Sequence, residues 1–151
     1  MTDPAFASRT PRLDLPLLFA GQAQRELFVN ECLARIDGLL HAAIEGVANA
    51  PPIEPGEGQC WLVGTAPTGA WTGQAGRLAL YQSGHWLFQA ARDGMRLLDR
   101  SSGVERRFAG EWRMASRPAP PSGGTTIDVE ARSALSALID SLSQAGILPA
   151  T

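Results

Sequence analysis

The chain has 151 residues, of which 44% are hydrophobic, enough for one domain with a modest packed core. Its formal net charge is −2, so no overall positive field favours binding to nucleic acid or to an anionic membrane. The sequence has no apolar run near the roughly 20 residues that span a bilayer and no apolar signal core at its start, so we expect synthesis in the cytoplasm without a signal peptide. Cys32 and Cys60 are too few for a disulfide framework, and both are expected to be buried free thiols.

Residues 1–21 are expected to form an extended arm, because Pro4, Pro11 and Pro16 each disfavour helix at the residue before them. The arm ends in an apolar tip that should be buried, either on a neighbouring molecule or on its own domain. The residues of this tip that we expect to dock are Leu15, Leu17 and Phe19.

Residues 22–50 are predicted to form a long helix with a heptad seam. Apolar residues recur in it at alternating spacings of four and three, a pattern typical of helices that pack against one another. The seam comprises Val29, Leu33, Ile36, Leu40, Ala43 and Val47. We therefore predict an oligomer interface that includes Leu33, Ile36 and Leu40, with a stripe wide enough to face the domain as well as a partner.

A polar face lies beside this seam if the helix begins near Gln22. Gln22, Glu26 and Asn30 then fall at positions i, i+4 and i+8, with Gln24 close by. Polar groups near such a seam can fix the register of an assembly, and an exposed polar face is the simpler alternative. Asn30 would instead be the N-cap if the helix began later.

Residues 51–115 change character, because short β-like runs alternate with Gly-containing turns. A small antiparallel meander or barrel of about five strands explains this pattern most simply. A linker rich in Pro and Gly follows over residues 116–125. The predicted fold class is therefore α+β, with a helix on each side of a small β module.

Residues 126–149 are predicted to form a second helix, with Thr126 or Asp128 as its N-cap and Gly146 at its C-terminal end. Its apolar residues repeat the alternating spacing of four and three and form a narrow seam. Such a helix is poorly stable alone and should pack on the domain or on copies of itself. The interface residues that we predict in it are Leu135, Leu138 and Leu142.

Patterns for catalysis or metal binding are weak. His41 and His85 are the only histidines, and neither belongs to a recognisable ligand spacing. Cys60 with His85 would make a nucleophile–base pair, but no flanking motif supports one. Glu54 and Glu57 would make a carboxylate pair, but a solvated loop explains them better. We therefore predict no catalytic residue, no cofactor and no metal site.

Aromatic side chains offer a binding alternative. Trp71, Tyr81 and Trp86 would form a platform on which sugar rings stack, and Trp71 is the best candidate for a surface position because Gly and Thr surround it. The alternative is a core role, which we expect of Trp61, Trp86 and Trp112 because large aromatics dominate small β cores. The arginine-rich stretch RRFAGEWR also contains acidic residues, which favours a solvated hairpin over a nucleic-acid site.

The run TPRLDLPLLFAGQAQRELFVNECLARIDGLL resembles the start of an uncharacterised domain family found in bacterial prophage and gene-transfer-agent structural gene clusters. The hallmark of that family is the pattern TPRL-LP-L-AGQAQKE---NEAL--LD. The matching residues here are Thr10, Pro11, Arg12, Leu13, Leu15, Pro16, Ala20, Gly21, Gln22, Ala23, Gln24, Glu26, Asn30, Glu31, Leu33 and Asp37. Arg25 stands where Lys is common and Cys32 where Ala is common, and the similarity continues over residues 10–148.

The resemblance implies a virion part: a tail, fibre or head-spike component, or the attachment base for one. It implies no established catalytic residues. With the two seams it leads to our main hypothesis, a non-enzymatic structural protein that forms a homo-oligomer and contacts other virion proteins, a trimer being favoured and a dimer also allowed. A carbohydrate-binding module for cell-surface polysaccharide stays open as an alternative, and a hydrolase of cell-surface polymer as a weaker one.

Overall fold

The structure is a computed structural model that describes residues 9–18, 21 and 25–150. In this part of the chain, two α-helices enclose eight short strands and one 3-10 helix. In chain order the elements are α1 (Arg25–Leu39), β1 (Ala43–Ile44), β2 (Val47–Ala48), β3 (Cys60–Val63), η2 (Gly69–Trp71), β4 (Leu78–Gln82), β5 (His85–Gln89), β6 (Arg96–Asp99), β7 (Val104–Ala109), β8 (Glu111–Met114) and α2 (Val129–Gln144).

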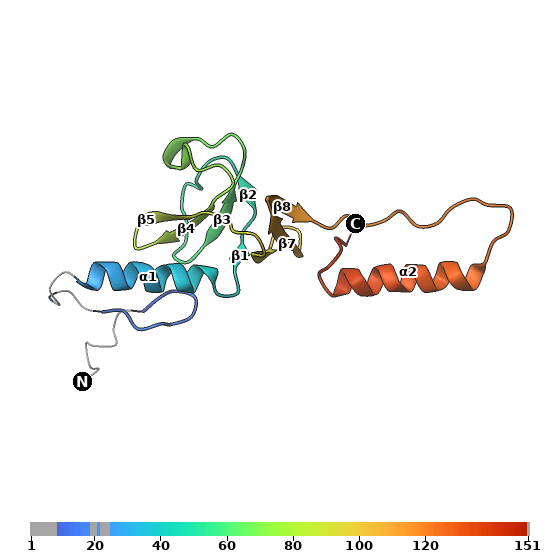
Figure 1. Ribbon diagram of the computed structural model, residues 1–151, viewed down its shortest axis with the longest axis horizontal. Coiled ribbons are helices and arrows are strands. Elements are labelled where there is room, and N and C mark those ends of the chain that lie inside the picture. Colours follow the sequence, from blue (N-terminus) through green and yellow to red (C-terminus); the bar gives the residue numbers. More distant parts are fainter. Residues whose placement is uncertain (1–8, 19–20, 22–24, 151) are drawn as a thin grey trace.

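The strands form two four-stranded mixed sheets (Figure 1). One sheet has the order β1-β6-β7-β8 and the other the order β2-β3-β4-β5. β1 and β2 run parallel to β6 and β3, and the remaining neighbours are antiparallel. The predicted α+β class is confirmed. The barrel and the single five-stranded meander are wrong, because the strands divide between two sheets that do not close into a barrel.

The first helix is shorter than predicted, because α1 ends at Leu39 and residues 43–48 join both sheets instead. Backbone hydrogen bonds from β6 and β3 hold this segment on its two sides, and Ile44 within it is fully buried. Long-range strand pairing and burial here outweigh a local helical pattern, as they often do for weak propensities. Ala43 and Val47 of the predicted seam therefore lie in β1 and β2.

The main core lies between the sheets and α1. Its buried members are Ala42, Ile44, Cys60, Leu62, Leu78, Leu80 and Leu97. α1 approaches this core through Gly38, which lies so close to β4 that a Cβ placed on it would be 2.6 Å from the side chain of Leu80. The absence of a side chain at Gly38 thus allows the helix to pack directly on the sheet.

A second core cluster surrounds Trp71, which is fully buried. Its ring centroid lies 5.1 Å from that of Trp86 and 6.3 Å from that of Trp61, in edge-on and tilted arrangements that aromatic pairs favour. The predicted surface position of Trp71 is therefore wrong, because the Gly-rich turn folds inward and carries the indole under the sheet. Trp61, Trp86 and Trp112 are half-buried and pack against the two core clusters, as expected.

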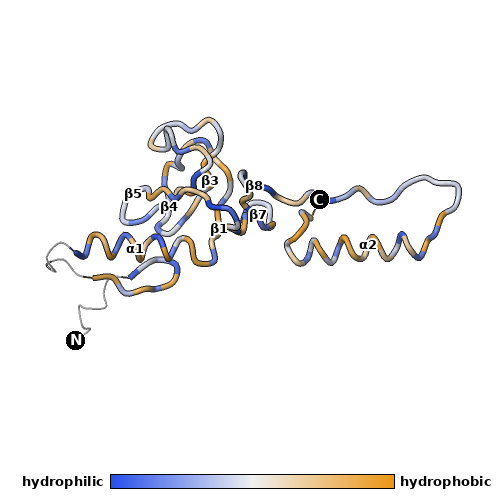
Figure 2. Tube along the Cα trace, in the orientation of Figure 1, coloured by the Kyte–Doolittle hydropathy of each residue, from blue (hydrophilic) through white to orange (hydrophobic). Residues whose placement is uncertain are grey.

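The linker runs outward from the end of the molecule where β7 and β8 lie, and α2 runs back beside it toward the sheets (Figure 1). Asp128 is its N-cap, with a side-chain oxygen that accepts a hydrogen bond from the amide of Ala131 at 2.8 Å. The helix ends at Gln144, followed by Gly146 with a left-handed φ of 71°, as predicted. Figure 2 shows apolar segments along both helices and in the turn after α2. Neither helix of the described chain is long and apolar enough to cross a membrane.

Candidate functional site

The described part of the arm folds back on its own domain and is held by Asp37 of α1, which is fully buried. One carboxylate oxygen accepts hydrogen bonds from the hydroxyl of Thr10 at 2.7 Å and from the amide of Leu13 at 2.6 Å. The other oxygen accepts from the amide of Arg12 at 3.0 Å. Several donors that converge on one carboxylate offset the loss of its hydration.

The guanidinium of Arg12 caps the C-terminal end of α1. It donates hydrogen bonds to the carbonyl oxygens of Asp37 and Gly38 at 2.8 Å and 2.9 Å, and to that of His41 at 2.8 Å. These terminal carbonyls have no partner within the helix, and the helix dipole favours a cation beside them. The cap is a further reason why the helix ends before the segment that joins the sheets.

Asn30 makes another tie between α1 and the arm. Its side chain exchanges two hydrogen bonds with the backbone of Leu18, at 2.8 Å and 2.9 Å. Because α1 begins at Arg25, the N-cap interpretation of Asn30 is wrong. Glu26 accepts a bond from the amide of Gly21 at 3.4 Å, so both polar residues act within the chain. The predicted interface residues Phe19, Gln22 and Gln24 lie outside the described residues.

The apolar residues of the arm are only half covered. Leu15 and Leu17 are half-buried, and Leu17 lines a hollow between the arm, α1 and the β4–β5 turn. His85 at the edge of that hollow is exposed, with Nδ1 2.7 Å from the carbonyl oxygen of Ser83. The arm therefore braces α1 and leaves some apolar surface of its own open.

The face of α1 turned away from the sheet is apolar and exposed. We call this surface the α1 outer face, and its residues are Phe28, Val29, Cys32, Leu33, Ile36 and Leu40. Phe28 is 76% exposed and Ile36 is 49% exposed. Cys32 is exposed as well, so its predicted burial is wrong. A surface helix normally turns its polar side to solvent, so an apolar outer face marks an interaction surface.

The second apolar surface lies on α2 and consists of Ala131, Leu135, Leu138 and Leu142, here called the α2 stripe. Leu135 is 48% exposed and Leu138 is 54% exposed. No residue of α2 is buried by any part of the chain that the structure describes. The linker contacts α2 through polar groups, with the Arg117 guanidinium 2.6 Å from the Asp140 carboxylate. A helix of 16 residues with so little support fits a partner along its stripe.

The side chains considered for catalysis have structural surroundings. Burial raises the pKa of the Cys60 thiol to about 12, so this thiol is protonated near neutral pH and is a poor nucleophile. The Glu57 carboxylate accepts hydrogen bonds from the amides of Ser83 and Gly84, at 2.7 Å and 3.1 Å, and so holds the β4–β5 turn. Glu54 is exposed. Among the described residues, no group of His, Cys, Asp and Glu side chains could hold a metal ion.

The predicted sugar-binding platform lacks its main residue, because Trp71 is fully buried and cannot stack on a sugar. Tyr81 and Trp86 remain, with ring centroids 4.9 Å apart, and both are half-buried. Trp86 also packs edge-on against Trp61 at 5.7 Å. Trp86 is therefore mainly part of the second core cluster, and Tyr81 packs against it from the outside.

The sequence did not predict the structural roles of two buried carboxylates, Asp37 and Asp99. Asp99 ends β6, is fully buried and lies 2.8 Å from the guanidinium of Arg106 on β7. Ser101 donates to it from both its hydroxyl, at 2.6 Å, and its amide, at 3.0 Å. Burial opposes ionisation of Asp99, but these hydrogen bonds and the Arg106 charge outweigh it and lower the pKa. The sequence signal for this role of Asp99 is the run DRSSG, which indicates a turn directly after an apolar strand.

These features define an α+β protein in which two mixed sheets support one helix at each end, with an apolar surface exposed on both. The chain belongs to the family described as "Protein of unknown function (DUF2793)", whose model matches residues 29–113, more than half of the chain. The match covers most of α1 and nearly all of both sheets, while the arm and α2 lie outside it. None of the curated proteins matches the chain.

Proposed function

We propose that this chain is a non-enzymatic structural component of a phage-like particle: a tail, fibre or head-spike protein, or the attachment base for one. The α1 outer face carries the proposal, because an exposed apolar surface on a well-packed domain fits a protein that works in an assembly. The resemblance of the arm and α1 sequence to proteins of prophage and gene-transfer-agent structural clusters supplies the biological setting. Its partners are then copies of itself and other virion proteins.

The two helices supply the contacts of the assembly. The α1 outer face contains Leu33, Ile36 and Leu40 of the predicted seam, and the α2 stripe contains Leu135, Leu138 and Leu142. Both keep the alternating spacing of four and three that packs helices side by side. A homotrimer is the favoured arrangement for the α1 contact, with the described part of the arm holding the helix in place through Asp37 and Asn30.

Whether the chain is present in purified particles tests this function. Particles released by the bacterium that encodes it are purified on a density gradient and probed with an antibody against the chain. We expect the chain to migrate with the particles, and we expect a chain carrying Ile36→Asp to be lost from them. Particles that assemble normally and lack the wild-type chain would contradict the proposal.

A further inference from the structure

We propose that α2 pairs antiparallel with α2 of a second copy of this chain. The acidic N-terminal end of each helix, its tip, then lies beside the arginine-rich surface next to the C-terminal end, or base, of the other. The inference rests on the proposed self-assembly and adds the orientation of one contact and the charges that fix it. The tip is the N-terminal end of α2, far from the sheets, and the base is its C-terminal end. The base is tied to β7 by a hydrogen bond from the amide of Glu105 to the carbonyl oxygen of Gly146, at 3.2 Å.

The α2 stripe is complementary to itself when one copy is reversed. Around a two-fold axis midway between Leu135 and Leu138, each of these residues faces the other on the second copy. Ala131 of each copy then faces Leu142 of the other, so the smallest residue of the stripe meets a large one. Such matching gives close packing, and a two-fold contact of this kind closes on itself.

Exposed apolar residues at the two ends of α2 extend the match. Ile127 at the tip is 57% exposed, and Ile147 at the base is 51% exposed. The antiparallel arrangement places the tip of one copy beside Ile147 of the other. A parallel arrangement would set tip against tip and base against base, so that the acidic tips and the basic surfaces of the two copies would repel each other.

A row of three arginines adjoins the base of α2. Arg96 on β6, Arg107 on β7 and Arg113 on β8 stand directly opposite one another, and all three are exposed. They line one hollow together with Ile147. Like charges directly opposite in a sheet are destabilising, so a negatively charged partner would stabilise this row of arginines.

The chain supplies only part of that negative charge itself. Arg96 pairs with Glu105 at 3.5 Å and Arg113 with Glu111 at 3.3 Å, both on the exposed surface. The central Arg107 guanidinium has no hydrogen bond or ion pair with any described residue. An acidic group from a second copy would complete the row at Arg107.

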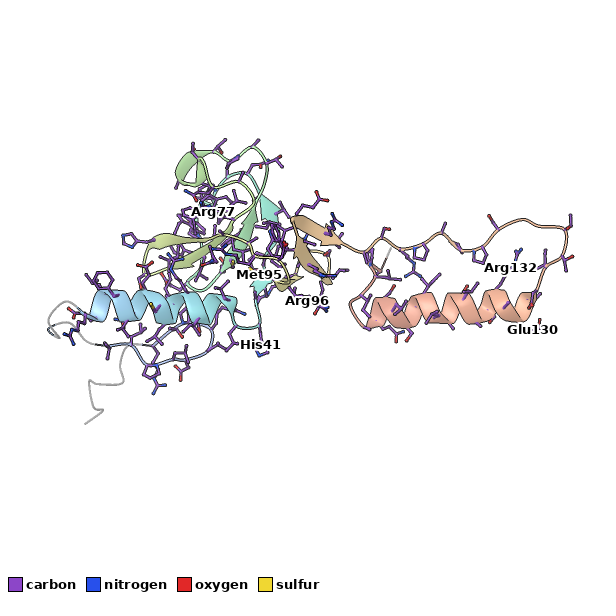
Figure 3. The ribbon with its side chains drawn as sticks, viewed as in Figure 1. His41, Arg77, Met95, Arg96, Glu130 and Arg132 are labelled. Atoms are coloured by element: carbon purple, nitrogen blue, oxygen red, sulfur yellow. The ribbon has the colours of Figure 1, made fainter. Side chains whose placement is uncertain are left out.

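Glu130 at the tip of α2 is the acidic group that reaches this row in the antiparallel pair. It is exposed and has no ion pair with any residue that the structure describes. Figure 3 shows Glu130 and Arg96 on the same side of the molecule, at opposite ends of the α2 arm. Arg132, by contrast, turns to the linker and donates a hydrogen bond to the carbonyl oxygen of Gly123. Reversing one copy thus brings Glu130 to Arg107, and such charge complementarity fixes orientation.

Disulfide cross-linking of the full chain tests the orientation. In a Cys32→Ser background, which removes the exposed native thiol, one chain carries Ala131→Cys and another carries Leu142→Cys, the two positions that face each other in the antiparallel pair. We expect rapid cross-linking when the two chains are mixed and little when either is oxidised alone. Cross-linking of Ala131→Cys with itself would show a parallel pair and overturn the inference.

Charge reversal provides a second test on the same cross-linked pair. Glu130→Arg on the first chain, or Arg107→Glu on the second, should slow cross-linking by about threefold to fivefold, and the two changes together should restore most of the rate. Glu54→Arg on the first chain changes the same charge in a distant loop and should leave the rate unaltered. Failure of the double reversal to restore the rate would overturn the contact between Glu130 and Arg107. An oligomer that forms without any cross-link through α2 would overturn the inference and leave the proposed assembly through α1 intact.

Discussion

Asp37 shows how one buried carboxylate joins two parts of the chain. It accepts hydrogen bonds from Thr10, Arg12 and Leu13 and so replaces its lost hydration with three donors of the arm. The arm in turn places the Arg12 guanidinium on the last carbonyls of α1. Docking of the arm and termination of the helix therefore depend on the same residue.

Asp37→Ala should lower the free energy of unfolding by about 3 kcal/mol, because it leaves several buried donors without an acceptor. Asp14→Asn is the control, because Asn tolerates the left-handed φ of 56° at this position. Asp14 is a largely exposed carboxylate of the arm that pairs with Arg9, so its loss should cost less than about 1 kcal/mol. Denaturant unfolding of the two variants measures the difference, and equal stabilities would contradict the role given to Asp37.

Asp99 makes stability depend on pH. Because its folded pKa is lowered, the unfolded chain takes up the proton first as the pH falls. The contribution of Asp99 is therefore complete above the unfolded pKa of about 3.9 and is lost as the pH falls through the lower, folded value. Asp99→Asn should lower the free energy of unfolding near neutral pH by about 3 kcal/mol and flatten its acid dependence. Unfolding curves between neutral and acid pH measure both effects, and an unchanged acid slope would contradict the assignment.

At the scale of the element, α1 has two faces with different tasks. One face carries Asn30, Asp37 and Gly38 and is covered by the arm and the sheet. The other is the α1 outer face, which none of the described chain covers fully. Val29, Leu33 and Ile36 of the predicted heptad seam lie on this second face, whereas Ala43 and Val47 lie in β1 and β2, and the role of the seam as an interface stays a prediction.

Ile36→Asp should weaken self-association by at least about tenfold and leave the fold intact, because a charge enters an apolar contact that only the assembly buries. Ile53→Asp is the matched control, since Ile53 lies in a loop and is 99% exposed. Sedimentation of both variants gives the association constant, and circular dichroism checks the fold. Equal association of the two variants would place the interface elsewhere.

The sequence predicted the elements whose signals are local. Asp128 and Gly146 mark the ends of α2 because caps are read from a few neighbouring residues. Residues 43–48 were misassigned, since their partners in β3 and β6 lie far along the chain. Trp71 was misplaced because Gly and Thr around it indicate a turn without saying which way the turn folds. The buried role of Asp37 was also out of reach, because its donors lie 24 to 27 residues away in sequence, in an arm expected to dock through apolar residues.

At the scale of the whole molecule, the two helices that carry the apolar surfaces lie toward opposite ends of an elongated shape, with α1 alongside β3, β4 and β5 (Figure 1). Two separate surfaces on one chain allow two kinds of contact, a property that suits a part of a larger assembly. If the α1 outer face forms a trimer and α2 forms the antiparallel pair, two trimers join through their α2 arms.

The absolute mass of the protein in solution, from light scattering behind a size-exclusion column, tests self-assembly most directly. The chain has a mass of 16.0 kDa. We expect the mass of a trimer or of two joined trimers, and we expect Ile36→Asp to reduce it. A wild-type protein that stays at 16.0 kDa at high concentration would contradict the account, because both helix surfaces would then remain exposed without a second copy to cover them.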